Sequence, residues 1–212
     1  MADLGPGVGG ERRPAPGEER GEGPERPARA AASVILLRDG LDGPEVLLVE
    51  RNPAQRFMGG AWVFPGGGVD PGEEAADTGV RELEEEASIA LGGVDGLVAY
   101  SRWITPREVK IRFDTYFFVA RAPEGAEPRP DGSECVGAIW RRPADALAEH
   151  GRGGLELVFP TVRHLEELAA FDSVEECLDR ARVRQVTPVT PRVVTVEGRR
   201  SVVMPGEPGY DA

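Results

Sequence analysis

Cysteine, histidine and lysine are scarce in this chain of 212 residues. Cys135 and Cys177 are the two cysteines and form no CxxC motif, so the sequence predicts reduced thiols and a cytoplasmic protein. The two histidines, His150 and His164, are too few and too far apart for a zinc site. These shortages argue against a disulfide-stabilised secreted scaffold and against a zinc protein.

Positive charge and long apolar runs are also lacking. The formal net charge is −12, whereas a nucleic-acid-binding surface needs a basic footprint to meet the phosphate backbone. No apolar stretch reaches the roughly 20 residues of a transmembrane helix. We therefore expect neither nucleic acid nor a membrane as a partner. The sequence leaves the oligomeric state open, a homodimer included.

Composition divides the chain into two parts. Residues 1–30 are rich in Gly, Pro, Glu and Arg and contain almost no large apolar side chains, which predicts a disordered tail. Residues 31–212 are enough for one domain with a substantial core. Within it we expect a core at about 31–145 and a C-terminal extension at about 146–212 that contains helices and a hairpin.

Hydrophobic periodicity predicts both strands and helices after the tail. The expected strands are 33–37, 45–49, 61–64, 96–103, 111–120 and 135–140. The expected helices are 74–87, 143–149, 161–170 and 173–182, and a terminal hairpin is expected from 188–194 and 200–204 around Glu197-Gly198. Such an alternation is typical of an α/β fold in which helices cover both faces of a mixed sheet.

Acidic residues gather at fixed intervals between Gly66 and Ile89. The intervals from Gly67 are six residues to Glu73, fourteen and fifteen to Arg81 and Glu82, and eighteen and nineteen to Glu85 and Glu86. Residues at i, i+3 and i+4 share a helix face, so Glu82, Glu85 and Glu86 are expected to project together. Such like charges destabilise an isolated helix, and a bound cation reverses that penalty. Mg²⁺ and Mn²⁺ prefer hard oxygen ligands, usually alongside substrate phosphates.

Glycines precede this helix. Phe64-Pro65-Gly66-Gly67-Gly68 is expected to end an apolar strand and open into a flexible turn, where glycine permits positive φ and close approach to a ligand. Pro71-Gly72 is expected to form a second turn into the helix. A lone run of glutamates would be an ordinary solvated helix face. The fixed spacing of the other positions favours a metal site instead.

The segment resembles the box of the Nudix hydrolases: G, five residues, E, seven residues, R-E, an aliphatic residue, one residue, E-E, one residue, G, an aliphatic residue. The matching residues are Gly67, Glu73, Arg81, Glu82, Leu83, Glu85, Glu86 and Ile89. Ser88 stands where the family has glycine. That glycine ends the helix in a left-handed conformation, so serine is expected to cost about 1 kcal/mol of stability rather than activity.

The resemblance implies a Nudix-type α/β/α sandwich and roles for the residues of the box. The ligands of Mg²⁺ or Mn²⁺ would be Glu82, Glu85, Glu86 and the carbonyl oxygen of Gly66 or Gly67. Glu82 would be either a ligand or the base that activates water, Arg81 would orient the acids, and Glu73 would brace the loop and the helix. The implied reaction is attack of a metal-activated water on a diphosphate bridge.

A second pattern lies between Leu47 and Gly67. It resembles the motif of the coenzyme A diphosphatase branch, L-L-T-x-R-S, three residues, R, three residues, G, three residues, F-P-G-G, above all in its peroxisomal-type members and bacterial proteins like them. Arg51 and Arg56 fit the arginine positions, whereas Val49 and Asn52 replace the threonine and the serine. Arginines suit the pyrophosphate and 3′-phosphate of coenzyme A. The alternative is that both arginines pair with the acidic helix.

Residues after the box supply further candidates. Glu134, in a loop rich in glycine and proline, is expected to join Arg81, Glu82 and Glu85 in the catalytic set, because a loop carboxylate often completes Nudix metal sites or serves as base. Asp131 is a second candidate, and a solvated loop acid is the alternative for both.

Trp103 and Arg112 lie on or beside expected strands. Trp103 is a candidate for stacking an adenine and Arg112 for contacting a phosphate, although such aromatic residues are more often part of a core. Burial in the core is our expectation for Phe113, Phe117 and Phe118.

These observations leave several functions open. The leading hypothesis is a Mg²⁺- or Mn²⁺-dependent hydrolase of a nucleoside diphosphate derivative, which cleaves coenzyme A or acyl-coenzyme A to 3′,5′-ADP and (acyl-)phosphopantetheine. An ADP-ribose or NADH pyrophosphatase is the alternative, because ADP-ribose-cleaving relatives carry a proline near the position of Pro106. A non-catalytic nucleotide-binding module is disfavoured, since no acid of the box is missing. Cleansing of oxidised nucleoside triphosphates is a further alternative.

Overall fold

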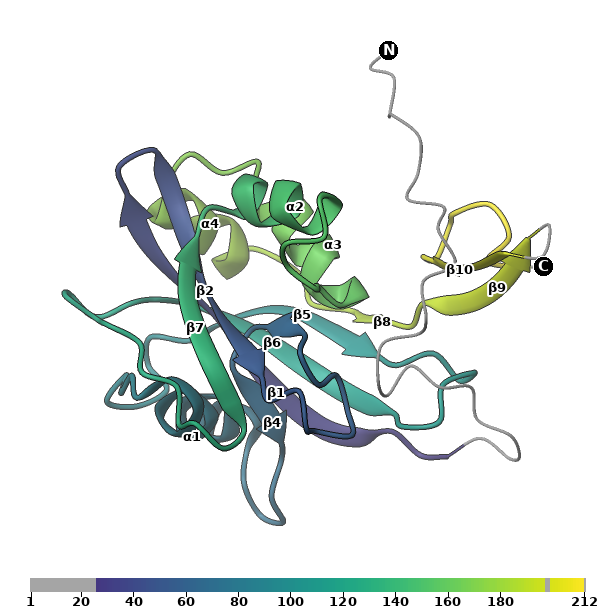
Figure 1. Ribbon diagram of the computed structural model, residues 1–212, viewed down its shortest axis with the longest axis horizontal. Helices are drawn as coiled ribbons and strands as arrows, with labels where there is room; N and C mark the ends of the chain where they lie inside the picture. The colour runs from purple at the N-terminus through teal and green to yellow at the C-terminus, as the bar shows by residue number, and fades with distance from the viewer. Residues whose placement is uncertain (1–25, 197–198, 212) are drawn as a thin grey trace.

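The computed structural model describes residues 26–196 and 199–211 (Figure 1). Its main sheet is built around β1 (Arg29–Gly40), which pairs antiparallel with β2 (Gly43–Arg51) and parallel with β6 (Phe113–Arg121). The strand order is β3-β2-β1-β6-β5-β8, where β3 is Trp62–Val63, β5 is Val98–Ile104 and β8 is Pro188–Val189. Two strands extend it: β4 (Gly66–Gly68) pairs with β1, and β7 (Cys135–Arg141) pairs with β2. The sheet is mixed, as the sequence predicted.

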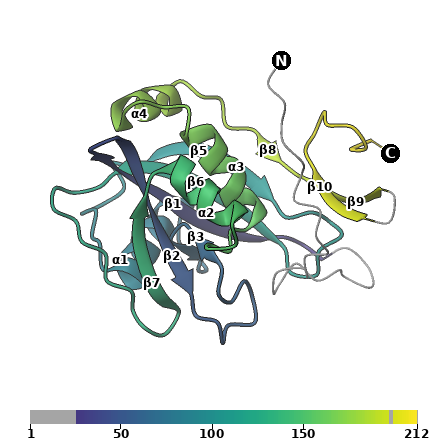
Figure 2. The same ribbon diagram turned by 45° about the horizontal axis from the view of Figure 1, so that its top comes forward.

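Both faces of this sheet are buried. Successive side chains of β1 point to opposite sides of the sheet, and the apolar residues of its central run are buried on both sides. Ile35 and Leu37 belong to one hydrophobic cluster, whereas Val34 and Leu36 belong to the other. Helix α1 (Ala75–Ala87) covers the second cluster. The first is covered by α2 (Pro143–Gly151), α3 (Phe159–Leu168) and α4 (Val174–Arg182), which lie on the opposite side of the sheet from α1 (Figure 2). The expected α/β/α sandwich is confirmed.

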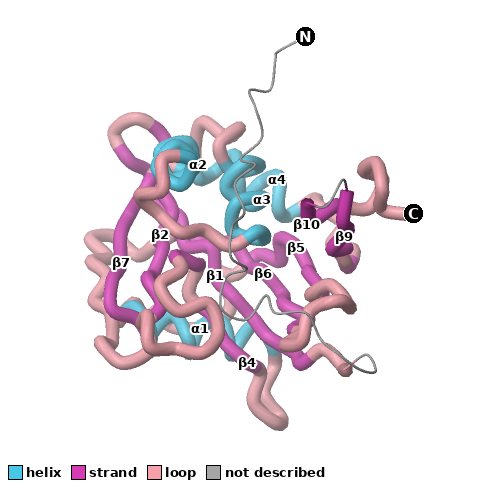
Figure 3. The backbone as a smooth tube through the Cα atoms, turned by 45° about the vertical axis from the view of Figure 1, so that its right-hand side comes forward, coloured by secondary structure: helices cyan, strands magenta, loops and turns pink. Residues whose placement is uncertain are grey.

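The region after residue 145 contributes to this core. Ala146, Leu165 and Leu178 are buried with the residues of β1 and β2 in the first cluster. Beyond the helices, β9 (Arg192–Val196) and β10 (Arg199–Val203) pair antiparallel as a separate two-stranded sheet, visible at the edge of the molecule in Figure 3. The expected hairpin is therefore present, while its turn at Glu197-Gly198 and the first 25 residues of the tail expected over 1–30 lie outside the described residues.

Three local predictions are wrong. Gly66–Gly68 is a strand paired with β1 rather than a flexible turn, and β8 pairs parallel with β5 instead of joining the hairpin. The reason for the first error is that Gly66 and Gly67 serve close packing, against β1 and against Glu82 of the following helix, which a sequence pattern does not distinguish from a turn. Residues 29 and 30, placed in the tail, begin β1.

The candidates for base stacking and phosphate contact occupy the interior. Trp103 is only 9% exposed and packs with Phe159 and His164 in the first cluster. Arg112 is buried, and its guanidinium donates to the carbonyl oxygens of Thr105 and Arg26. Both side chains therefore serve packing in this structure rather than the roles considered for them. The core position expected for Phe117 is confirmed, whereas Phe113 and Phe118 are half-buried.

The two cysteines are free and lie on opposite sides of the sheet, Cys135 in the cluster beneath α1 and Cys177 in the other. Among the described residues, no helix combines the length and apolar character needed to cross a membrane.

His164 is a buried histidine at the centre of the first cluster. Its Nδ1–H donates to the carbonyl oxygen of Pro160 at 2.7 Å, so Nε2 accepts from the hydroxyl of Ser101 at 2.6 Å. The ring centroid lies 4.4 Å from that of Phe117. Burial lowers the pKa of His164 to about 4, and the imidazole is neutral at pH 7.

This burial predicts acid sensitivity. The folded-state pKa lies below the unfolded value, so the stabilisation is complete above pH 6.5 and is lost as the pH falls towards 4. We expect the free energy of unfolding of the wild type to fall relative to that of His164→Gln by up to about 1.4 kcal/mol per pH unit in this range. Urea unfolding at several pH values measures it, and equal slopes for the two proteins would contradict it.

Candidate active site

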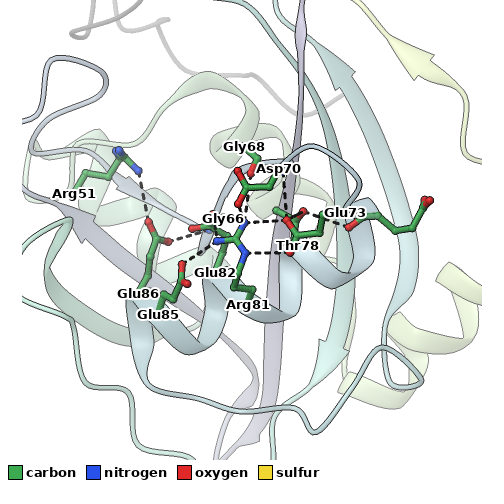
Figure 4. Close-up of polar contacts among 11 residues, drawn as sticks. Arg51, Gly66, Gly68, Asp70, Glu73, Thr78, Arg81, Glu82, Glu85 and Glu86 are labelled. Carbon is green, nitrogen blue, oxygen red and sulfur yellow. Dashed lines mark hydrogen bonds and ion pairs between the residues drawn. The ribbon is translucent and has the colours of Figure 1, made fainter.

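Helix α1 presents the acidic residues because its other side is apolar. Leu83 and Ala87 are fully buried and pack in the same cluster as Val34 and Leu36 of β1. Gly79 allows the close approach, since a Cβ atom there would lie 3.0 Å from the side chain of Val34. The acids consequently occupy the part of the helix surface that borders β4 (Figure 4).

Arg81 joins three of these acids. Its Nε and Nη2 donate to the two carboxylate oxygens of Glu73 at 3.0 and 3.1 Å. Its Nη1 donates to Glu82 Oε1 at 2.8 Å and to Glu85 Oε2 at 2.9 Å. The hydrogen bonds to Glu73, and then to the other two acids, raise the pKa of Arg81 above its usual range. One guanidinium therefore holds together carboxylates that repel one another.

Glu73 connects the loop before α1 to the helix itself. Besides Arg81, its carboxylate accepts from the hydroxyl of Thr78 at 2.7 Å and from the N–H of Asp70 at 3.4 Å. The hydrogen bonds from Arg81 and Thr78 lower the pKa of Glu73 to about 2, so it is ionised at neutral pH. This geometry suits a residue that braces the loop and the helix. Thr78 was not singled out from the sequence, although its spacing of five from Glu73 allows the contact.

Glu86 is the most buried acid of the site, with an exposure of 2%. One carboxylate oxygen accepts from the N–H of Gly66 at 2.9 Å. The other, Oε1, accepts no hydrogen bond from the described residues and lies 3.6 Å from Nη1 of Arg51. Burial raises the pKa of Glu86 to about 7, against the opposing effects of Gly66 and Arg51. A buried carboxylate oxygen without a donor is costly and marks a position for a cation.

Glu82 packs directly against the glycines of β4. Its carboxylate is so close to Gly67 that a Cβ atom added to Gly67 would lie 2.2 Å from Glu82 Oε1. A Cβ on Gly66 would lie 2.3 Å from the carbonyl oxygen of Ala32 in β1. Burial raises the pKa of Glu82, opposed by Arg81 and aided by the charges of Glu85 and Glu134. Close approach is therefore what requires glycine at both positions.

The donor set suits a divalent cation, although the side chains are not arranged around one. Within residues 26–196 and 199–211, no three acidic, histidine or cysteine side chains converge closely enough to hold a metal ion. Glu82 and Glu85 are turned to Arg81, while Glu86 is turned to Gly66 and Arg51. Three carboxylates on one helix, one with an oxygen lacking a donor, nevertheless provide the hard ligands that Mg²⁺ and Mn²⁺ prefer.

Ser88 ends α1 in the left-handed conformation, with φ of 56° and ψ of 32°. Its N–H donates to the carbonyl oxygen of Glu84, and its hydroxyl donates to that of Arg129 at 3.0 Å. The left-handed helix end predicted at this position is confirmed. The contact with Arg129 also offsets part of the strain of a side chain there.

The two arginines of the preceding motif are placed differently. Arg51 is mostly buried; it pairs with Glu86 and donates through Nε to the carbonyl oxygen of Phe57 at 3.3 Å. Arg56 is exposed and makes no hydrogen bond or ion pair with the described residues. Pairing with the acidic helix, the alternative considered for both, is thus seen for Arg51 alone.

The loop before β7 brings Glu134 near the acids of α1. Glu134 is exposed, and its charge is close enough to influence Glu82. Asp131 has a structural role instead, because its carboxylate accepts hydrogen bonds from the N–H groups of Ser133, Glu134 and Cys135 in its own loop. Although burial acts in the opposite direction, these hydrogen bonds lower the pKa of Asp131 below its usual range. Asp131 therefore shapes the loop that presents Glu134.

Adjacent glycines offer a matched test of the close contact at Glu82. A methyl group at Gly67 collides with the Glu82 carboxylate, whereas one at Gly68 meets nothing within 4 Å. We expect Gly67→Ala to lower phosphohydrolase activity by about tenfold to a hundredfold by displacing Glu82, while Gly68→Ala retains it. Steady-state kinetics and thermal unfolding of both variants check this, and equal activities would show that the contact does not matter.

The comparisons with known proteins agree with this geometry. A sequence model of the NUDIX domain matches residues 27–161. Nudix hydrolase 3 of Caenorhabditis elegans is 29% identical over 149 residues, which are 70% of this chain and 60% of that protein. The crystal structure of a NUDIX hydrolase from Alicyclobacillus acidocaldarius has a TM-score of 0.69 and 26% identity, covering 75% of this chain and 99% of that one. A MutT NUDIX hydrolase from Burkholderia pseudomallei has a TM-score of 0.52 and 25% identity over 66% and 98%.

The family match spans more than half of the chain and includes β1 to β7 together with the acidic helix. The solved structures share the layered arrangement of sheet and helices. The chain belongs to the Nudix hydrolase family.

Proposed function

We propose that this Nudix hydrolase uses Mg²⁺ or Mn²⁺ to cleave the diphosphate linkage of coenzyme A or acyl-coenzyme A, releasing 3′,5′-ADP and (acyl-)phosphopantetheine. The observation that carries the proposal is the buried Glu86 oxygen without a donor, 3.6 Å from Arg51 of the arginine motif, whose other arginine, Arg56, is exposed. The acids supply an anionic site for metal, and the arginines supply cations for phosphate. The free cysteines support the further proposal of a cytoplasmic location.

Glu82, Glu85 and Glu86 would hold the cation, together with the carbonyl oxygen of Gly66 or Gly67. When bound, the cation polarises phosphoryl oxygens and lowers the pKa of water. Arg81 keeps Glu82 and Glu85 in place through the 2.8 and 2.9 Å hydrogen bonds. Burial keeps water from Glu86 and strengthens the electrostatic interactions of its carboxylate, including the ion pair with Arg51.

Proton transfer falls to Glu82 or Glu134 in this proposal. Burial raises the pKa of Glu82, a direction that makes its carboxylate a better proton acceptor. Glu134 is exposed on the loop before β7, and its charge acts on Glu82. In this proposal it would hold a water molecule beside Glu82. If Glu82 is a ligand of the cation, Glu134 is the base; otherwise Glu82 itself is the base. Substitution of each glutamate distinguishes these two arrangements.

The two arginines have separate roles in this proposal. Arg51, which lies 3.6 Å from Glu86, would contact the pyrophosphate beside the cation. Arg56, five residues further along and exposed, would contact the 3′-phosphate that distinguishes coenzyme A from its dephosphorylated form. A bidentate arginine discriminates strongly between a phosphate and a hydroxyl group.

Two glutamates of α1 provide a test of the metal site. Glu85 belongs to the acid group, whereas Glu84 is exposed and takes no part in it. We expect Glu85→Gln to lower kcat with coenzyme A by about 100-fold or more and Glu84→Gln by less than about twofold. Products are separated by chromatography after incubation with Mg²⁺ or Mn²⁺.

The same assay includes acetyl-coenzyme A, ADP-ribose, NADH and diadenosine polyphosphates. Preferential release of AMP from ADP-ribose would replace coenzyme A with the alternative substrate. Full activity of Glu85→Gln would contradict the assigned ligands.

Arg56→Ala is expected to raise KM for coenzyme A about tenfold and to leave KM for dephospho-coenzyme A nearly unchanged, because only the former carries the 3′-phosphate. Arg152→Ala, a change at an exposed arginine that follows α2 on the other face of the sheet, is the control. The measurement is KM for both substrates with each variant. An equal change for both substrates would show that Arg56 does not read the 3′-phosphate.

A further inference from the structure

Asn52 joins two loops that are far apart in the sequence. Its N–H donates to the carbonyl oxygen of Glu134 at 2.8 Å, and its side-chain NH₂ donates to that of Ser133 at 2.9 Å. We call residues 52–60, which carry Arg56, the arginine loop, and residues 131–134, which carry Glu134, the acid loop. Asn52 is the first residue of the arginine loop, so this pair of hydrogen bonds connects the loops at one point.

The same side chain also shapes its own loop. Asn52 Oδ1 accepts from the N–H of Ala54 at 3.0 Å, and its carbonyl oxygen accepts from the N–H of Gln55 at 2.9 Å. A serine at this position could accept the bond from Ala54, because a hydroxyl forms a similar local turn. A serine is too short to reach Ser133 as well. The bond from the asparagine NH₂ group to Ser133 is therefore the part of the link between the loops that depends on the side chain, whereas the bond from the N–H to Glu134 belongs to the backbone.

Hydrogen bonds within the acid loop define its shape. Asp131 accepts from the N–H groups of Ser133, Glu134 and Cys135, and Gly132 donates its N–H to Cys135.

Just before the acid loop, the N–H of Arg129 donates to the carbonyl oxygen of Ala87, and the hydroxyl of Ser88 donates to the carbonyl oxygen of Arg129, so this end of the loop is attached to the end of α1. The two hydrogen bonds from Asn52 attach the opposite end, at Ser133 and Glu134.

The attachment is close to the acids of α1. The β2–β7 register shifts between Glu50 and Arg51, and Arg51 then lies opposite Cys135. Cys135 is fully buried in the cluster beneath α1, and Arg51 contacts Glu86 at 3.6 Å. Each loop thus begins or ends next to a residue that is anchored at the metal-binding end of the helix. A displacement of the acid loop would move Glu134 relative to Glu82.

We propose that Asn52 is a positioning residue, which holds Glu134 at the distance from Glu82 that catalysis requires by linking the acid loop to the arginine loop. The proposal rests on the proposed hydrolase function, in which Glu134 serves the reaction. Asn52 itself need not touch the substrate. Its loss should therefore affect kcat more than KM.

Asn52→Ser is the test variant, because it retains the local turn and removes only the bond to Ser133. We expect kcat to fall about tenfold, the smaller end of the effects of residues that orient catalytic groups, with KM changed less than about twofold. Glu134→Gln and the double variant complete a thermodynamic cycle. If Asn52 acts through Glu134, adding Asn52→Ser to Glu134→Gln lowers kcat by less than about twofold.

An unchanged kcat for Asn52→Ser, an unchanged kcat for Glu134→Gln, or full additivity of the two would overturn the proposal. A KM effect alone would overturn it too, since that would assign Asn52 to substrate binding through the arginine loop.

A readout without substrate separates this proposal from the proposed function. Hydrogen exchange followed by mass spectrometry is expected to show that residues 131–135 exchange faster in Asn52→Ser than in the wild type. Helix α1 is expected to exchange at the same rate in the two proteins. Inactivity of the wild type towards every diphosphate tested would refute the hydrolase proposal, and the exchange data would still decide whether Asn52 holds the acid loop. Exchange of this loop equal to that of the wild type would show that it does not.

Discussion

The repulsion among the carboxylates of α1 is the constraint on which the rest of the site depends. Arg81 offsets it by hydrogen bonding to Glu73, Glu82 and Glu85, while Glu86 is buried against Gly66 and Arg51. One arginine cannot neutralise this many acids, and Glu86 Oε1 remains without a hydrogen-bond donor. The excess of negative charge is what a divalent cation would remove, so the same arrangement that costs stability without metal favours binding of metal.

The fold holds the acids in place through direct contact between α1 and the glycines of β4. Gly66 and Gly67 pair with Ser33 and Ala32 of β1 and lack the side chains that would collide with the sheet or with Glu82. The core fixes the helix from below, because Leu83 is fully buried among the apolar residues of β1. Helices on the other face complete the burial of the sheet, and thus support a site to which they contribute no acid.

The sequence predicted most of what depends on local spacing. The helix over 74–87 follows from intervals and residue types and is observed within one residue at α1. The left-handed end at Ser88 follows from the resemblance of this position to the glycine of the Nudix box, and it is also observed. Contacts that depend on the register between strands distant in the chain could not be predicted from the sequence. The hydrogen bonds from Asn52 arise only because β2 and β7 pair with an irregularity at Arg51. Burial of Trp103 and Arg112 was equally hidden, since a side chain suited to a ligand is also suited to a core.

We propose above all that the acidic end of α1 binds a divalent cation through its buried carboxylate. Isothermal titration of the wild type and of Glu86→Gln with Mn²⁺, in the absence of substrate, measures this binding. We expect saturable binding to the wild type, accompanied by a rise in its unfolding temperature, and at least about tenfold weaker binding to the variant. Equal affinity of the two proteins for Mn²⁺, or no binding by the wild type, would contradict it.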